Sequence, residues 1–387
     1  MKCRCVVLVR VALTAFVQLG FAQLDTTWLR RFDGGRANED WVSDMFVDNA
    51  GYVYVAGSVV LDSFWDIVVQ KYTPDGNRLW SVNYDGSGHN DDSAAALTVD
   101  PAGNVYVCGW VTDSAFGMDM VTLKFSPAGA LLWAKTFHQA GRGEDAALAI
   151  CLDQAGNVVV TGYSTDATLF NIDYCTIKYN AATGDTLWVR FYNRTPEDDE
   201  DVSVSVCSDD SNYTYITGYS YDDGTDYDIA TICYRPDGSR RWLRRFNNYP
   251  WMSEDYGVKV VYDRTTRSVI VGGTVDDENQ YYNYFTMKYR RTGDSVWART
   301  YNRYPANDED WLTDVGIGPG SRVYVTGMSF DNNTGFDVAT VCYESTGVPR
   351  WVARQDLAAG DDAGLNLVVD SLGQVLVAGY LETAVPD

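Results

Sequence analysis

The chain has 387 residues, of which 46% are apolar, and a formal net charge of −23 at pH 7. This length accommodates two or three ordinary domains or one large repeat array. The negative charge excludes a protein that grips nucleic-acid phosphates through a basic surface, and it disfavours docking to anionic lipid.

Residues 1–22 are typical of a secretory signal peptide. A basic start at Lys2 and Arg4 precedes a mostly apolar run that ends in small residues suited to cleavage. A transmembrane anchor is the alternative, but Arg10 interrupts the apolar run, which is too short to span a bilayer well. We therefore expect residues 23–387 to be secreted, periplasmic or on the cell surface, with no membrane insertion after cleavage.

Tryptophan marks a repeat along the rest of the chain. The spacings between successive copies are 52, 53, 55, 54, 55 and 54 residues. The marker residues are Trp28, Trp80, Trp133, Trp188, Trp242, Trp297 and Trp351. A period near 50 residues with several short strands per unit indicates a propeller and not a helical solenoid.

Each repeat contains four short segments with the alternation of β-strands. The first follows an acidic pair, as in EDAALAICLD (144–153), and the second is VYVCG (105–109). The third is DIVVQKY (66–72) and the fourth carries the tryptophan, as in RLWSVNY (78–84). Turn sequences such as TPDGN (73–77) separate the third from the fourth. Four antiparallel strands make one propeller blade, and each blade covers the apolar face of the next.

We therefore predict an all-β fold, a single seven-bladed β-propeller of four-stranded antiparallel blades over residues 23–387. The chain begins with a fourth strand at Trp28 and stops just after a second strand. The N-terminal strand is thus expected to close the ring within the last blade, which lacks a third strand unless a segment outside this sequence supplies it. Six blades with loose ends is the alternative.

The phrase GNVYVCG (103–109) after an acidic turn resembles the SBBP-type bacterial β-propeller repeats. The phrase DIVVQKYTPDG (66–76) is similar to the related delta-60 repeats. The resemblance covers about residues 28–380 and implies an exported or surface propeller. It implies no common catalytic residue or cofactor.

Six cysteines remain after signal cleavage, and their scatter over the repeat argues against disulfides. They are Cys108, Cys151, Cys175, Cys207, Cys233 and Cys342. A disulfide framework would not be missing from single copies, so we predict free thiols. Zinc is disfavoured because the chain has no CxxC motif and only two histidines.

Acidic residues recur at the loops before the first strand and before the third strand, on one expected face. Asp residues beside turns usually accept bonds from nearby backbone N–H groups, and that structural role is the first interpretation. Calcium is the second, because it takes several oxygen ligands. Its candidates cluster in the fourth repeat: Asp222, Asp223, Asp226, Asp228, Glu200 and Asp201. A catalytic carboxylate pair is a third interpretation, although no single pair stands out.

Aromatic residues in the longer loops are the candidates for partner binding. They are Tyr249, Trp251, Tyr281, Tyr282 and Tyr304. Such rings suit stacking on a sugar or packing against a protein, although packing between blades is the alternative. No nucleophile or phosphate-loop motif is present. We therefore predict a monomeric binding or scaffold module for a protein or glycan, with no catalytic residue, cofactor or nucleic-acid partner. The alternative is a hydrolase or lyase with a site at the central channel.

Overall fold

The computed structural model describes residues 5–11, 30, 40–61, 63–113, 117–139, 143–166, 171–194, 200–249, 253–277, 281–303, 309–356 and 360–381. In this part of the chain the regular structure is β-strand, apart from a single 3-10 turn, η1 (Pro319–Ser321). The predicted all-β class is confirmed.

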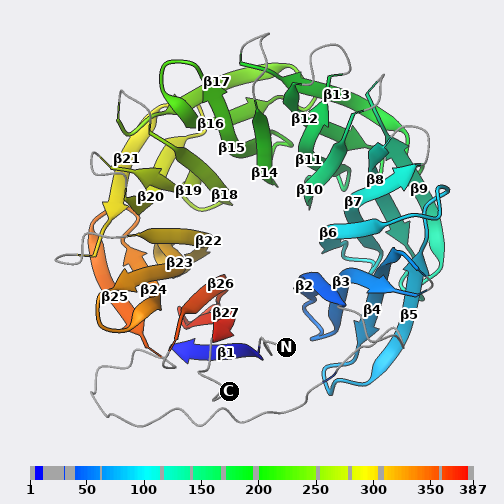
Figure 1. The fold of residues 1–387 in the computed structure, drawn as a ribbon, viewed down its shortest axis with the longest axis horizontal. Coiled ribbons are helices and arrows are strands. Elements are labelled where there is room, and N and C mark those ends of the chain that lie inside the picture. Colours follow the sequence, from blue (N-terminus) through cyan, green and yellow to red (C-terminus); the bar gives the residue numbers. More distant parts are fainter. Residues whose placement is uncertain are drawn as a thin grey trace. The chain divides into compact units, whose positions relative to one another are not determined.

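The strands form six four-stranded sheets and one three-stranded sheet, in which neighbouring strands pair in the antiparallel direction. Strands that follow one another in sequence lie side by side within each four-stranded sheet (Figure 1). The first three of these sheets are β2 (Trp41–Val47), β3 (Val53–Val60), β4 (Trp65–Tyr72) and β5 (Arg78–Tyr84); β6 (Asp92–Val99), β7 (Val105–Asp113), β8 (Gly117–Phe125) and β9 (Leu131–Phe137); β10 (Asp145–Leu152), β11 (Val158–Thr165), β12 (Ile172–Tyr179) and β13 (Thr186–Tyr192).

The next three sheets have the same strand order. They are β14 (Asp201–Ser208), β15 (Thr214–Asp222), β16 (Asp226–Tyr234) and β17 (Arg240–Phe246); β18 (Asp255–Asp263), β19 (Ser268–Asp276), β20 (Tyr282–Arg290) and β21 (Ser295–Tyr301); β22 (Asp310–Gly318), β23 (Arg322–Asp331), β24 (Gly335–Tyr343) and β25 (Pro349–Gln355). The chain divides into two compact units, residues 26–216 with 234–241, and residues 1–25 with 217–233 and 242–387.

The turn between the first and second strands of each sheet shows why a similar sequence segment recurs in each repeat. In the second repeat, Asp100 Oδ1 accepts hydrogen bonds from the backbone N–H groups of Ala102 and Asn104, both at 2.9 Å. Its Oδ2 accepts the hydroxyl of the buried Tyr106 at 3.0 Å. Gly103 adopts a φ of 84°, which an L side chain rarely takes. The recurring segment DPAGNVYV (100–107) therefore forms a turn that one carboxylate holds in place, and the recurrence is explained without a ligand.

The apolar cores lie between successive sheets of each unit. One core joins Tyr54 and Ile67 of the first sheet to Leu97 and Leu123 of the second. A corresponding core joins strands β19–β21 to β22–β24 in the other unit. Each sheet therefore covers the apolar face of its successor, which is the packing that the sequence repeat predicts.

The marker tryptophans connect each sheet to the next. The indole Nε1 donates to a backbone carbonyl in the third-to-fourth-strand turn of the following repeat, at 3.0–3.1 Å. The pairs are Trp80 with Pro127, Trp133 with Ala181, Trp188 with Pro236, Trp242 with Arg291, and Trp297 with Ser345. In these five copies the marker tryptophan therefore packs between one repeat and the next.

The last sheet differs from the sequence prediction. Its order is β1 (Cys5–Val11), β27 (Val375–Leu381) and β26 (Asp362–Val369), with Val7 opposite Gly379. A segment of the predicted signal peptide thus occupies the third-strand position that was expected to be empty. The physical reason is that the open edge of β27 offers unpaired N–H and C=O groups to an apolar extended segment. The predicted closing strand at Trp28 lies outside the described residues.

The six cysteines that were predicted to be free are free thiols. Four of them are buried, namely Cys108, Cys175, Cys233 and Cys342. Burial raises the pKa of Cys108, Cys175 and Cys342, so these three thiols are poor nucleophiles at neutral pH. Within the described residues, no helix has the length and apolar character to cross a bilayer.

Candidate functional site

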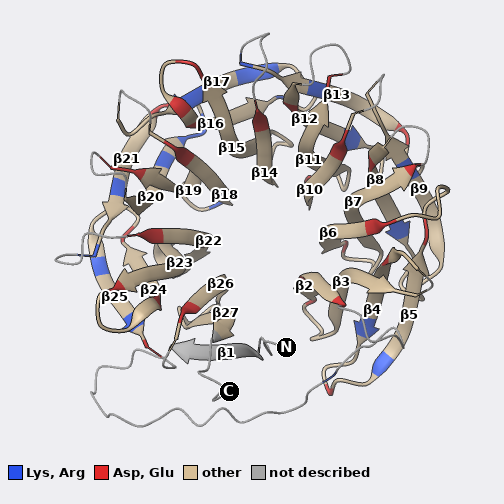
Figure 2. Ribbon diagram, in the orientation of Figure 1, with Lys and Arg blue, Asp and Glu red and all other residues tan. Residues whose placement is uncertain are grey.

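The second acid of the repeated pair is a structural clamp that accepts backbone N–H groups in five repeats, at Asp92, Asp145, Asp201, Asp255 and Asp310. It is the first residue of β6, β10, β14, β18, β22 and β26, where Figure 2 shows acidic positions in red. In β18, Asp255 accepts the backbone N–H of Asn248 at 2.6 Å and of Asp276 at 3.1 Å. It thereby fastens the loop before the first strand to the end of the second strand. Asp145 binds Gln139 and Thr165 in the same way.

These clamping carboxyls are buried and therefore resist ionisation. Burial raises the pKa of Asp255 to about 7, against the opposing effect of its two backbone hydrogen bonds. Burial likewise raises the pKa of Asp310 to about 6, and it also raises the pKa of Asp92 and Asp145. Raised carboxyl pKa values are common at catalytic sites. Here the same position is buried in one repeat after another, so the clamp itself explains the shift.

The calcium candidates of the fourth repeat differ in their partners and in their exposure to solvent. Asp228 is buried and its Oδ2 accepts a hydrogen bond from Arg245 Nη2 at 2.6 Å. Asp222 lies 3.7 Å from the same guanidinium. Asp223 is exposed, whereas Asp226 is half-buried with a φ of 68°. Arg245 therefore supplies, at Asp228, the positive charge that calcium would supply under the second interpretation.

The other two calcium candidates belong to the compact unit that holds residues 26–216. Glu200 forms an isolated bridge with Ile172. Asp201 is buried and accepts the backbone N–H of Arg194 at 2.8 Å, as the other clamping acids do.

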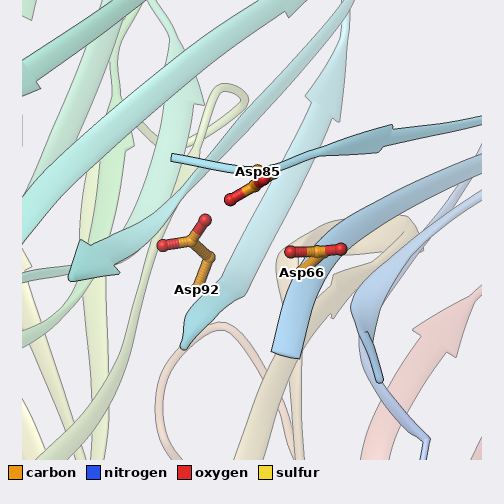
Figure 3. A group of neighbouring side chains, drawn as sticks. All are labelled: Asp66, Asp85 and Asp92. Atoms are coloured by element: carbon orange, nitrogen blue, oxygen red, sulfur yellow. The ribbon is translucent and has the colours of Figure 1, made fainter. Parts of the chain in front are cut away.

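A different group of carboxylates meets the spacing of a metal site. Asp66, Asp85 and Asp92 each offer an oxygen atom, and these atoms lie within 4.8 Å of one another. Figure 3 shows the three carboxylates close together. Asp92 is a clamp whose oxygens accept the N–H groups of Gly86 and Thr112. Among the described residues this is the group of His, Cys, Asp and Glu that could hold a metal ion.

The acidic trio of Asp66, Asp85 and Asp92 is not repeated along the chain. The position of Asp85, five residues after the marker tryptophan, is His138 in the next repeat and Asn247 in the fourth. A histidine also lies beside this acidic trio, because His89 Nδ1 lies 2.6 Å from Asp85 Oδ2. That hydrogen bond raises the pKa of His89 and so favours its protonated form. When it is protonated, His89 offsets part of the negative charge of the carboxylates.

The predicted aromatic candidates are scattered. Tyr249 is 40% exposed. The half-buried Tyr281 is fixed through its backbone, which accepts a hydrogen bond from Asn283 at 3.1 Å. Trp251 and Tyr304 lie outside the described residues. Tyr282 alone of the described candidates belongs to a larger aromatic group.

That group is a continuous line of rings within the unit that contains residues 217–233 and 242–387. Successive ring centroids are 5.5, 5.3, 5.2, 6.3 and 4.1 Å apart. All six rings are half-buried. We call this line the aromatic strip; its members in order are Tyr221, Tyr227, Tyr219, Tyr256, Tyr282 and Trp311.

Two glutamates bind the polar atoms of the aromatic strip. Glu254 Oε2 accepts the hydroxyl of Tyr256 at 2.9 Å and also the hydroxyl of Tyr282. Glu309 Oε2 accepts the indole N–H of Trp311 at 3.1 Å. Both glutamates are the first acid of a repeated pair. The strip therefore combines aromatic faces with carboxylates.

Five members of the strip were missed by the sequence analysis, although a signal existed. Tyr256 and Trp311 directly follow the acidic pair, where the second, third and fourth repeats have Ser93, Ala146 and Val202. An aromatic residue that replaces a small or aliphatic one in neighbouring copies marks a feature that the repeat itself does not need.

Comparison with known proteins assigns no family. No protein-family model and no curated protein matches the chain. A europium-containing methanol dehydrogenase is 12% identical over 91% of this chain and 82% of its own, with a TM-score of 0.44. Drosophila Plexin A in complex with Semaphorin 1b is 9% identical over 89% and 88%, with a TM-score of 0.45. A Bacteroides caccae protein of unknown function is 10% identical over 74% and 90%, with a TM-score of 0.42.

Proposed function

We propose that this protein is an exported seven-bladed β-propeller, of the SBBP and delta-60 kind, that works as a monomeric binding or scaffold module for a protein or glycan. The successive four-stranded sheets support the propeller, since each buries its apolar face against the next. The apolar start of the chain supports export. The proposed ring closure uses the strand at Trp28, after removal of residues 1–22.

The aromatic strip is the observation that carries the binding function. Repeated structural residues explain the turns, the clamps and the tryptophan contacts, but they do not explain six adjoining half-buried rings in one part of the repeat array. Aromatic residues bring large contact area with little conformational freedom to lose, and they are enriched in binding surfaces. A surface of this composition suits recognition better than chemistry, because the adjoining glutamates already accept hydrogen bonds from the rings.

An array experiment tests this function. The labelled mature protein is applied to arrays of glycans and of surface proteins from the source organism, and the supernatant is examined for chemical change in the bound material. The proposal predicts saturable binding with the ligand unchanged. Turnover of a bound ligand would instead support the hydrolase or lyase alternative, and absence of any saturable binding would contradict the binding module.

Calcium is a separate proposal for the fourth repeat. Carboxylates of Asp222, Asp223 and Asp226 have the oxygen chemistry that calcium takes, but Arg245 already pairs with Asp228. The melting temperature is measured in calcium and in chelator at matched ionic strength, for the wild type and for Asp226→Asn. A calcium-dependent rise that Asp226→Asn abolishes would support the proposal, and equal melting temperatures in the wild type would reject it.

A further inference from the structure

The charges around the aromatic strip restrict which ligand it can take. Glu254 and Glu309 lie on the strip and bind its rings. Two more carboxyls adjoin the strip: Asp226 directly precedes Tyr227 in the chain, and Asp276 is paired with Tyr282 across strands β19 and β20. Four acidic groups thus border one aromatic surface, and a ligand that approaches it meets a negative potential.

The hydrogen bonds of the strip restrict the ligand further. The donors of Tyr256, Tyr282 and Trp311 all point to glutamate oxygens within the protein. Around these three rings, the polar atoms left for a ligand are consequently the carboxylate oxygens of Glu254 and Glu309, which are hydrogen-bond acceptors with negative charge. A fitting ligand has to supply donors and positive charge itself.

The aromatic rings of the strip also favour a positively charged ligand. An aromatic face attracts a cation through its quadrupole, most strongly for Trp and then Tyr. A phenol or indole that donates to a carboxylate has a more electron-rich ring, which strengthens that attraction. Tyr282 and Trp311 have centroids only 4.1 Å apart and each donates to a glutamate. This pair, at one end of the strip, is therefore the part of it with the strongest attraction for a cation.

We propose that the aromatic strip binds a segment of a partner protein through its lysine or arginine side chains, with the cation over the faces of Tyr282 and Trp311 and between Glu254 and Glu309. The proposal rests on the binding function proposed above and names the chemistry of its partner. Charge complementarity selects this occupant: the whole chain carries −23, and the strip gathers acidic groups around rings. A neutral glycan gains the stacking but nothing from the charge.

The test compares peptide probes on matched variants. A hexapeptide of alternating lysine and glycine is titrated against the mature protein by calorimetry, beside the same peptide with glutamate for lysine and a neutral chitin oligosaccharide. Glu254→Gln removes one charge at the strip while an amide oxygen can still accept the tyrosine hydroxyls. Trp311→Leu removes a ring face.

Glu144→Gln is the control for net charge. Glu144 occupies the repeat position of Glu254, is exposed, and belongs to the other compact unit. Each variant is first compared with the wild type by circular dichroism and melting temperature. Tyr282→Leu, which removes the other ring face proposed to contact the cation, serves as the second strip variant if Trp311→Leu does not fold.

We expect the lysine peptide to bind, the glutamate peptide not to bind, and the affinity for lysine to fall about tenfold in Glu254→Gln and in Trp311→Leu. Glu144→Gln should stay within about twofold of the wild type. Equal weakening by Glu144→Gln, or no weakening by either strip variant, would overturn the proposal. Binding of the chitin oligosaccharide without binding of the lysine peptide would overturn it too, but would leave the broader binding function standing.

Discussion

At the scale of the residue, a buried carboxyl that clamps a loop makes a contribution to the free energy of unfolding that depends on pH. Asp255 accepts two backbone hydrogen bonds, yet burial dominates and raises its pKa to about 7. The folded state therefore favours the protonated acid. Relative to the unfolded chain, this favourable contribution is complete below about pH 4, the ordinary pKa of Asp, and is lost as the pH rises through about 7.

The first prediction follows from that sign. The free energy of unfolding should rise when the pH falls from 7.5 to 5.5, whereas many proteins lose stability on acidification. Each pKa unit is worth about 1.4 kcal/mol, so Asp255 alone gives a change on the order of 2 kcal/mol over this interval. Urea titrations at both pH values measure it.

The isosteric Asp255→Asn variant provides the control, because it cannot ionise. Its stability should vary less between pH 5.5 and 7.5 than that of the wild type. The same pH dependence in both proteins would show that Asp255 is not responsible.

At the scale of the element, the repeat unit is a sheet whose turn receives the tryptophan of the preceding sheet. Trp188 donates to the carbonyl of Pro236, and Gly238 of the same turn lies against the indole. A Cβ added to Gly238 would lie 2.7 Å from Trp188 Cγ, and its backbone has a φ of 82°. The turn therefore has no room for a side chain.

The second prediction compares two glycines with the same backbone conformation. Gly156 also has a φ of 82°, but a Cβ there would meet nothing within 4 Å. Gly156→Ala should cost only the strained conformation, about 1 kcal/mol of unfolding free energy. Gly238→Ala should cost about 2–4 kcal/mol, because overpacking against Trp188 adds to the strain. Denaturant unfolding measures both; equal losses would remove the tryptophan contact from the account.

The strands and turns that recur in every repeat could be predicted from the sequence, whereas the side-chain clusters that belong to single repeats could not. Trp188 and Asp100 stand in positions that recur, so their strand and turn were predictable from spacing alone. The ring line through Tyr219, Tyr256 and Trp311 depends on which strands lie side by side across repeats, and the pattern within one repeat does not contain that information. The acidic trio at Asp85 was likewise hidden, because its members come from two repeats.

At the scale of the whole molecule, the proposed ring closure depends on which N-terminal segment completes the last sheet. The edge of β27 pairs with β1, whose residues the sequence assigns to a signal peptide. Signal cleavage after Ala22 would remove β1 from the exported protein. The proposed closing strand at Trp28 would remain.

The third prediction uses three chains, residues 1–387, 23–387 and 34–387. Chains 1–387 and 23–387 should melt at the same temperature and elute as monomers. Chain 34–387 should melt lower or aggregate, since loss of the segment at Trp28 exposes a sheet edge. Differential scanning calorimetry and size-exclusion chromatography measure these outcomes. A loss of stability already in 23–387 would assign the structural role to β1 instead.

The central claim is that this protein binds its partner through the aromatic strip. The most direct measurement is the affinity of the strongest array ligand, whatever its class, for the wild type and for the double variant Tyr282→Leu/Trp311→Leu. Trp41→Leu is the control, because Trp41 occupies the repeat position of Trp311 and is 45% exposed in the other compact unit. The account predicts a loss of at least about tenfold in the double variant, because contact residues at the centre of an interface commonly contribute more than 1 kcal/mol each, and no loss in the control. An unchanged affinity in a folded double variant would contradict it.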